Sequence, residues 1–192
     1  MSKIITLTGT PGTGKTEVAR VMAKKLDCEL LSINDLIENK ELRYTIDKLR
    51  KTKVVDVKIL QKLISKKTKN RSFIIEGHYS HFLKSDLTII LRCNPSELAK
   101  RLKKKGWNHA KIKENIESEL IGVISAEASR NKHAIEIDTS GKKPEMVVVE
   151  IMKKIQKSTT TFPVGNVHTH ASANRIDWLN PKIFSRLKKV LD

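Results

Sequence analysis

Residues 9–16 read Gly-Thr-Pro-Gly-Thr-Gly-Lys-Thr, the complete pattern of a phosphate-binding loop. A short apolar run at 4–8 precedes this loop, and a segment with helical apolar spacing follows it. The glycines let backbone N–H groups turn toward a polyphosphate, and the start of the helix directs its positive dipole at the same phosphates. Lys15 is predicted to contact the β- and γ-phosphates, and the Thr16 hydroxyl to ligate Mg²⁺.

The predicted nucleotide-binding residues extend from the loop into the first turn of the helix. The amides of that turn are expected to complete the phosphate contacts. A glycine-rich turn without a ligand is the alternative, and the flanking strand and helix argue against it. The set comprises Gly12, Thr13, Gly14, Lys15, Thr16 and Glu17.

A second group of candidate residues is Glu76-Gly77-His78, which follows an apolar run at 73–75. An acid at the end of a neighbouring strand can hold Mg²⁺ directly or through water, so Glu76 is a candidate metal ligand and catalytic residue. His78 is expected near the γ-phosphate, where it could orient or deprotonate a water or polarise a phosphate oxygen. A structural hydrogen bond is the alternative for His78, and it is the favoured interpretation for His81.

A third feature is the basic end of a predicted helix, where Arg101 and residues 103–105 precede Gly106. Cations at this position complement the carboxyl end of the helix. Alternatively, they belong to a short lid that closes on ATP and places positive charge on its phosphates. The lid interpretation makes Arg101 and Lys105 candidate nucleotide ligands, with Trp107 packing beneath the lid.

The positive charge of the chain is concentrated in two stretches. The 192 residues have a net charge of +17 and are 39% hydrophobic, which suits one domain with an appendage. Residues 48–71 carry ten Lys and Arg against one acid, and residues 100–113 carry seven and no acid. Such surfaces attract polyanions, so RNA is a predicted partner. Nucleotide binding and generic solvated lysine faces are the alternatives.

Other features of the chain bear on its environment. No run of 18 apolar residues is present, and the sequence enters its first strand without an apolar signal region. Cys28 and Cys93 are isolated, which predicts reduced, core-type thiols. We therefore expect an intracellular, cytoplasmic protein without a membrane span. His168 and His170 form only a weak candidate for a metal site.

Short β-rich runs alternate with helical patterns along residues 1–157. This alternation predicts an α/β fold with a parallel sheet covered on both faces and ligands at the carboxyl ends of the strands. After the first strand, we expect strands at 29–33, 72–76, 87–92 and 134–138, and helices at 56–67, 95–104, 110–131 and 144–156.

The composition changes after Lys157, so residues 158–192 are predicted to form a C-terminal extension. A polar linker is followed by a short basic amphipathic pattern, in which Asn180 can cap a helix and Pro181 occupies its first turn. The extension either folds back on the core or serves as an arm for a partner protein or RNA.

In combination, these motifs resemble the nuclear adenylate kinase isoenzymes, also described as coilin-interacting nuclear ATPases, and their archaeal relatives. The resemblance covers about residues 3–157. It rests on the phosphate loop, the acid-x-His at 76–78, Leu-Arg-Cys at 91–93, Arg-Leu-x-x-Lys-Gly-Trp at 101–107 and the helical motif at 115–128.

The resemblance implies a three-layer nucleoside monophosphate kinase fold with a five-stranded parallel sheet. It further implies an AMP-binding insert at about 34–56, a small lid at about 105–115, and adenylate kinase activity with accompanying ATPase activity that uses Mg²⁺. The implied biological role is maturation of the small ribosomal subunit and rRNA processing, in contact with a platform ribosomal protein or rRNA.

The chain departs from the family pattern at three places. Glu76 stands where the family has Asp, and Lys105 where it has Arg, so contacts at 105 are expected to be weaker because Lys cannot stack or bind bidentately. The insert is poor in acids, which leaves the AMP-site residues unassigned, with Asn34 and Arg43 named only as candidates. Classical adenylate kinases carry Asp-Gly-Phe-Pro-Arg where this chain reads Glu-Gly-His-Tyr-Ser at 76–80. The missing Arg argues for slower transfer to AMP, and His78 for water as an acceptor.

Three functional readings follow from these residues. The leading one is an enzyme that transfers the γ-phosphoryl group of ATP to AMP and also hydrolyses ATP. The second is a ribosome-assembly factor that binds RNA or a ribosomal protein and uses ATP as a switch. A sugar or shikimate-type kinase shares the loop and the size. A GTPase is disfavoured, because the Asn-Lys pairs at 39–40 and 131–132 lack the Asp of a guanine-binding element.

Overall fold

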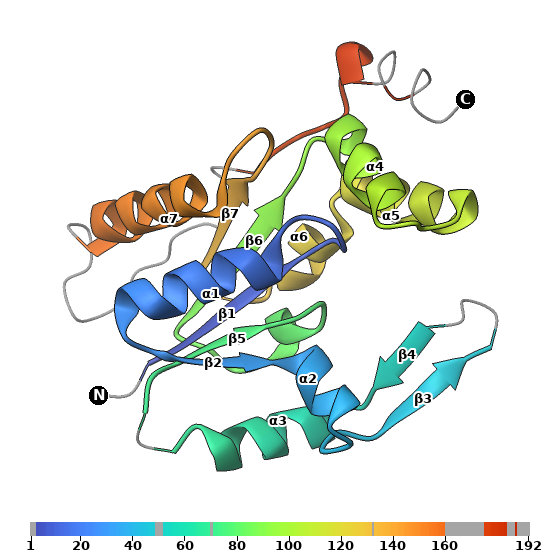
Figure 1. The fold of residues 1–192 in the computed structure, drawn as a ribbon. Helices are drawn as coiled ribbons and strands as arrows, with labels where there is room; N and C mark the ends of the chain where they lie inside the picture. The colour runs from blue at the N-terminus through green and yellow to red at the C-terminus, as the bar shows by residue number, and fades with distance from the viewer. Residues whose placement is uncertain are drawn as a thin grey trace.

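The computed structural model describes residues 3–48, 52–69, 71–131, 133–159, 175–183 and 187. Its main feature is a five-stranded, entirely parallel sheet in the order β2-β5-β1-β6-β7 (Figure 1). The predicted α/β fold is thereby confirmed. The strands are β1 (Ile4–Gly9), β2 (Glu29–Ser32), β5 (Phe73–Glu76), β6 (Leu87–Arg92) and β7 (Ala134–Asp138).

Side chains that alternate along the strands divide the core into two layers. On one face, Leu7 and Ile74 pack with helices α1 (Lys15–Leu26) and α7 (Pro144–Thr159). These two helices lie side by side in front of the sheet in Figure 1. Parallel strands covered on both faces are mostly apolar, which explains the many Ile and Leu residues of these strands.

On the opposite face, Phe73 and Ile75 pack with helices α2 (Ile33–Glu38) and α3 (Val57–Lys67). The short helix α6 (Val123–Ala128) covers β6 on this face. A 3₁₀ turn, η1 (Ser80–Phe82), follows β5. Residue 33 begins α2, whereas the sequence pattern had placed it at the end of a strand.

Helices α4 (Pro95–Lys104) and α5 (His109–Ile121) form a separate apolar cluster beside the sheet (Figure 1). The turn 105–108 joins them, and the Asn108 side chain caps α5 by accepting from the Lys111 amide at 2.9 Å. This turn and the first half of α5 occupy the range predicted as a lid.

The predicted helix over 110–131 is wrong as a single element. It is divided into α5 and α6 by Gly122, which has a φ of 67° and ends one helix while it caps the next. Glycine takes this left-handed conformation without steric cost. The four-residue apolar steps run across the break because both helices direct that face inward.

A two-stranded antiparallel hairpin, β3 (Tyr44–Asp47) and β4 (Thr52–Val55), lies within the predicted insert at 34–56. The sequence pattern did not predict these strands, because they are short and mostly exposed. In Figure 1 the hairpin extends away from the main sheet, on the side where the strands of the sheet end.

The described part of the C-terminal extension packs on α4 and α5, so the folded-back alternative holds for these residues. Asn180 Oδ1 accepts from the Ile183 amide at 3.1 Å, as a helix cap does, and Ile183 and Leu187 are buried. The rest of the predicted amphipathic pattern, and His168 and His170, lie outside the described residues.

Candidate active site

The phosphate loop joins the end of β1 to the start of α1 and packs directly against α4. Gly12 and Gly14 have φ values of 93° and 94°, a conformation that side chains with a Cβ rarely adopt. A Cβ at Gly12 would also lie 2.8 Å from Leu98 Cδ1 and 3.0 Å from Leu102 Cδ2. Glycine is therefore required at position 12 both for the turn and for contact with α4.

The loop encloses the ammonium group of Lys15. Nζ donates to the carbonyl oxygens of Gly9 at 2.8 Å and Thr10 at 3.2 Å, and Thr13 Oγ1 donates to the same Thr10 carbonyl at 2.8 Å. Lys15 as a residue keeps some exposed surface, but burial of its charged end lowers its pKa to about 8. Lys15 therefore remains mostly protonated at pH 7 and can meet a phosphate as a cation.

The predicted Mg²⁺ ligands, Glu76 and Thr16, are oxygen donors near Lys15, as suits an ion held mainly by nucleotide phosphates. Glu76 ends β5, is 2% exposed, and lies close enough that its charge opposes part of the lowering of the Lys15 pKa. Thr16 lies next to Lys15 in the first turn of α1. Such a site needs only one or two protein ligands, and in the described ranges no three or more His, Cys, Asp or Glu side chains converge as a metal centre.

His78 follows β5 and lies near Lys15. Protein atoms around the ring and the charge of Lys15 lower the pKa of His78 to about 4, although the residue as a whole is exposed. The Gly9 main chain opposes this shift in the pKa of His78. The ring is therefore neutral at pH 7 and lies near Lys15, and its contact with a γ-phosphate stays a prediction.

His81 has a structural role. Its Nε2 lies 3.1 Å from Glu127 Oε2, and because a carboxylate only accepts, this nitrogen carries the proton of the neutral ring. Nδ1 is then free to accept from Thr8 Oγ1 at 2.9 Å. Burial lowers the pKa of His81 to about 4, so both nitrogens are satisfied in the neutral state.

The structure places the two basic lid candidates differently. Arg101 lies against the loop, where Nη1 donates to the Gly12 carbonyl at 3.4 Å and Nη2 to the Thr139 carbonyl at 2.9 Å, and it pairs with Glu97. Lys105 is exposed at the carboxyl end of α4 and lowers the pKa of Lys15. Both cations flank the loop, while their nucleotide contacts remain predictions.

Other candidates lie further from the loop interior. Glu17 is exposed and pairs with Arg20 at 3.0 Å, so its predicted contribution is limited to its main-chain amide. The AMP candidates Asn34 and Arg43 are exposed on α2 and before β3. Cys93 is buried, which raises the pKa of its thiol to about 12, and Cys28 is half-buried, as expected for core-type thiols.

Sequence reasoning missed a buried ion pair beside the loop. Arg92 Nε donates to Glu119 Oε1 at 2.7 Å, and each side chain is at most 3% exposed. The available signal was an acid three residues after Ile116 on the apolar face of a helix, together with an arginine that ends an apolar strand.

The strand–loop–helix unit, with Lys15 inside the loop and an acid on the neighbouring strand, defines a nucleotide-binding protein of the phosphate-loop class. A family model described as an AAA domain matches residues 5–122. Proteins from Thermococcus kodakarensis and Pyrococcus furiosus, each named "Putative adenylate kinase", are 41% and 42% identical over 156 and 154 residues. These alignments cover 80% and 79% of this chain and 86% and 83% of the relatives. The chain belongs to this nucleoside monophosphate kinase family.

Solved structures support the fold. A thymidylate kinase from Candida albicans aligns over 86% of this chain and 96% of its own, with a TM-score of 0.53 and 14% identity. A shikimate kinase from Acinetobacter baumannii aligns over 82% and 95%, with a TM-score of 0.55 and 21% identity. At such identities the likeness concerns the fold alone. The adenylate kinase part of the predicted resemblance is confirmed at the family level, and its nuclear, coilin-interacting part stays a prediction.

Proposed function

We propose that the protein is an adenylate kinase that transfers the γ-phosphoryl group of ATP to AMP and so produces two ADP. The observation that carries this proposal is the enclosed Lys15 ammonium group between the phosphate loop and Glu76. The names of the relatives favour AMP as the acceptor. The β3–β4 hairpin provides a second element beside the carboxyl ends of the strands, where the acceptor would bind.

Lys15 and the loop would stabilise charge on the transferred group. As a cation at pH 7, Lys15 compensates the negative charge of the β- and γ-phosphates as the bond to the leaving ADP breaks. The proposed Mg²⁺ ligands are Thr16 and Glu76, and the ion would neutralise phosphate charge when bound. Arg101 and Lys105 are proposed to add positive charge from the α4 side.

We further propose that ATP hydrolysis accompanies the transfer, with His78 orienting the water. A base of pKa about 4 removes a proton from water poorly at pH 7, but a neutral imidazole accepts a hydrogen bond from it. Hydrolysis is therefore expected to be slow compared with transfer to a bound AMP.

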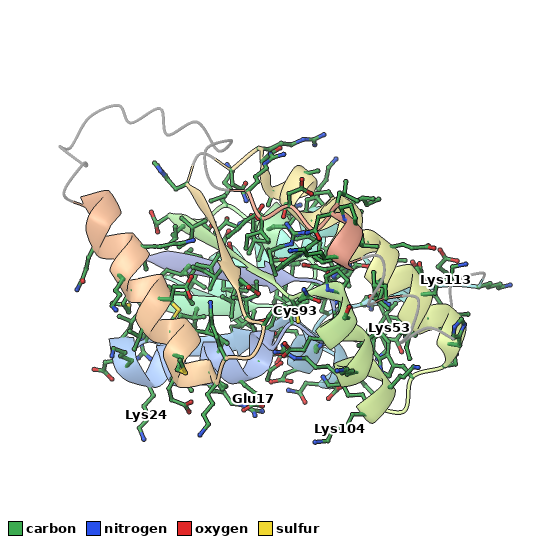
Figure 2. All side chains as sticks on the ribbon, turned by 90° about the horizontal axis from the view of Figure 1, so that it is seen from above. Glu17, Lys24, Lys53, Cys93, Lys104 and Lys113 are labelled. Atoms are coloured by element: carbon green, nitrogen blue, oxygen red, sulfur yellow. The ribbon has the colours of Figure 1, made fainter. Side chains whose placement is uncertain are left out.

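The second candidate function is a role in maturation of the small ribosomal subunit, through contact with rRNA or a platform ribosomal protein. Exposed lysines on α3 to α5 and the hairpin favour it, and Figure 2 shows Lys104 and Lys113 extending outward. RNA affinity should fall steeply with salt and differ between the ATP and ADP forms. RNA affinity that is independent of the bound nucleotide would contradict the use of ATP as a switch.

No helix among the described residues is long and apolar enough to cross a bilayer.

Turnover by the purified protein tests the adenylate kinase proposal. Product is measured with ATP and Mg²⁺ alone and with added AMP, and Lys15→Ala serves as the blank. Two ADP formed per AMP consumed, well above the rate with ATP alone, would support the proposal. Phosphate release that AMP does not change would contradict it and favour an ATP-driven switch.

A further inference from the structure

A buried carboxylate connects the C-terminal segment, residues 175–183 and 187, to the phosphate loop. We infer that Glu119 is a positioning residue for the loop, and that the C-terminal segment, through Trp178, is part of the ATP site. This inference rests on the proposed function only in that the loop must bind ATP, and it does not depend on AMP as the acceptor.

Glu119 accepts hydrogen bonds from several distant parts of the chain. Oε2 accepts from Thr10 Oγ1 at 2.5 Å. Oε1 accepts from Arg92 Nε at 2.7 Å, the Cys93 amide at 3.0 Å and Trp178 Nε1 at 3.1 Å. One carboxylate therefore joins the loop, the end of β6 and the C-terminal segment.

Arg92 attaches the same segment by a second route. Its Nη1 donates to the Ile176 carbonyl at 3.1 Å and to Glu136 Oε2 at 3.1 Å, and the Ile176 amide donates to the same Glu136 oxygen at 2.7 Å. The segment is thus held by main-chain bonds to a buried ion pair, which a loosely packed tail would not make.

Apolar packing leads from the segment to the loop along a different path. Trp178 and Ile183 belong to the cluster that contains Leu98 and Leu102 of α4. These two leucines are the side chains that lie against Gly12 in the loop. The segment therefore supports the loop through α4 as well as through Glu119.

The hydrogen bond between Glu119 and Thr10 bears on ATP binding because Thr10 also contacts Lys15. The Thr10 carbonyl accepts from Lys15 Nζ and Thr13 Oγ1, so a shift of Thr10 would move both groups. Phosphate contacts are sensitive to displacements of about 1 Å. Trp178 is only 9% exposed, so water cannot readily reach Glu119 to replace the hydrogen bond from the indole N–H if that bond is lost.

The test compares two substitutions in the C-terminal segment. Trp178→Phe removes the N–H donor and retains a ring, whereas Leu179→Ala changes an exposed side chain of the same segment that belongs to neither path to the loop. The Kd of ATP with Mg²⁺ is measured by calorimetry, and the Tm without nucleotide. Trp178→Phe is expected to raise Kd about three- to tenfold, and Leu179→Ala to leave Tm close to that of the wild type and to change Kd less than about twofold. Equal Kd values for Trp178→Phe and the wild type would overturn the inference.

Substitutions at Thr10 test the other end of the connection and do not depend on the folding of Trp178→Phe. Thr10→Val removes the hydroxyl at nearly constant volume, and Thr10→Ser retains it. Thr10→Val should raise Kd while Thr10→Ser binds ATP like the wild type, and equal binding by both variants would overturn the inference. In the double variant with Trp178→Phe, the increase in Kd should be smaller than the product of the single increases. An increase in Kd equal to the product of the two single increases would also count against a shared route through Glu119.

The two proposals fail in different ways. Normal AMP phosphorylation with no effect of these substitutions on ATP binding would remove only the inference. Altered ATP binding in an enzyme that does not use AMP would remove only the adenylate kinase proposal.

Discussion

The two sides of the phosphate loop are built differently. On the α4–α5 side, the loop contacts a buried ion pair, Arg92 with Glu119, and an apolar cluster completed by Trp178. On the other side stands the β3–β4 hairpin, whose apolar side chains Tyr44 and Ile46 are 41% and 63% exposed. A hydrogen bond from the Tyr79 hydroxyl to the Lys53 carbonyl, at 3.2 Å, connects the hairpin to the segment after β5.

This difference indicates how the two substrates would be handled. Buried, fully bonded charges fix the side where we propose that ATP binds, because each displacement would leave a buried charge uncompensated. The exposed hairpin buries little apolar surface, so it can change position at low cost when an acceptor binds. We therefore expect ATP binding to depend on preformed geometry and AMP binding to depend on rearrangement.

The largest effect should come from the centre of the ATP side. Lys15→Ala removes the cation that the loop encloses, and we expect both transfer and hydrolysis to fall by about 10³-fold. The matched control is Lys24→Ala, an exposed lysine on the same helix, which should retain wild-type rates. A Lys15→Ala enzyme with rates near the control would remove the basis for the comparison.

Stability should depend strongly on the buried ion pair. Arg92→Leu leaves Glu119 and Glu136 buried without their cation, and should lower the free energy of unfolding by about 3–5 kcal/mol. The control Arg20→Ala breaks an exposed pair with Glu17 and should cost less than about 1 kcal/mol. Denaturant titration measures the free energy of unfolding of both variants. Similar losses in the two would show that burial of the ion pair does not distinguish the α4–α5 side of the loop.

Acidification should act through His81, whose ring is hydrogen-bonded to Thr8 in β1 and Glu127 in α6. The unfolded ring, with a pKa of 6.5, binds a proton between pH 6.5 and 4 where the folded ring, with a pKa of about 4, does not. The contribution of His81 to the free energy of unfolding therefore falls as the pH falls through this window, by about 3 kcal/mol between pH 7 and pH 4. Denaturant titrations at pH 7 and pH 4 measure how far the free energy of unfolding falls. This fall should be smaller in His81→Gln than in the wild type by about the same amount. An unchanged pH dependence in the variant would contradict the assignment.

His78→Ala should separate the two reactions. If His78 orients water, hydrolysis is expected to fall about 10- to 100-fold while transfer to AMP falls less than about threefold. Parallel assays with and without AMP measure the two rates. An equal loss in both reactions would place His78 in the shared binding of ATP.

The smallest effect should arise on the hairpin side. Tyr79→Phe removes only the bond to the Lys53 carbonyl, worth about 1 kcal/mol, and should raise the KM for AMP about two- to fivefold. The Kd of ATP should stay unchanged. A Tyr79→Phe enzyme with a raised Kd of ATP and an unchanged KM for AMP would contradict the assignment of AMP to the hairpin side.

Local patterns predicted much of the fold. β6, β7 and α4 were predicted with their observed bounds, because their apolar runs and the proline in the first turn of α4 are local signals. The hairpin and the division at Gly122 were not predicted. Exposed strands lack an apolar pattern, and a glycine inside a helical pattern does not reveal its φ.

The candidate site was predicted only where its residues are close in sequence. The loop, Glu76 and His78 belong to short motifs. The Glu119 contacts join residues 109 and 59 positions apart, to Thr10 and Trp178, and a single sequence gives no signal for such pairs.

The destination of the γ-phosphate tests the central claim most directly. ATP labelled in its γ-phosphate is incubated with AMP, Mg²⁺ and the protein, and the labelled products are separated over time. The proposed adenylate kinase places the label in the β-phosphate of newly formed ADP, with little in free phosphate. Label that appears only as free phosphate, at a rate independent of AMP, would contradict the claim.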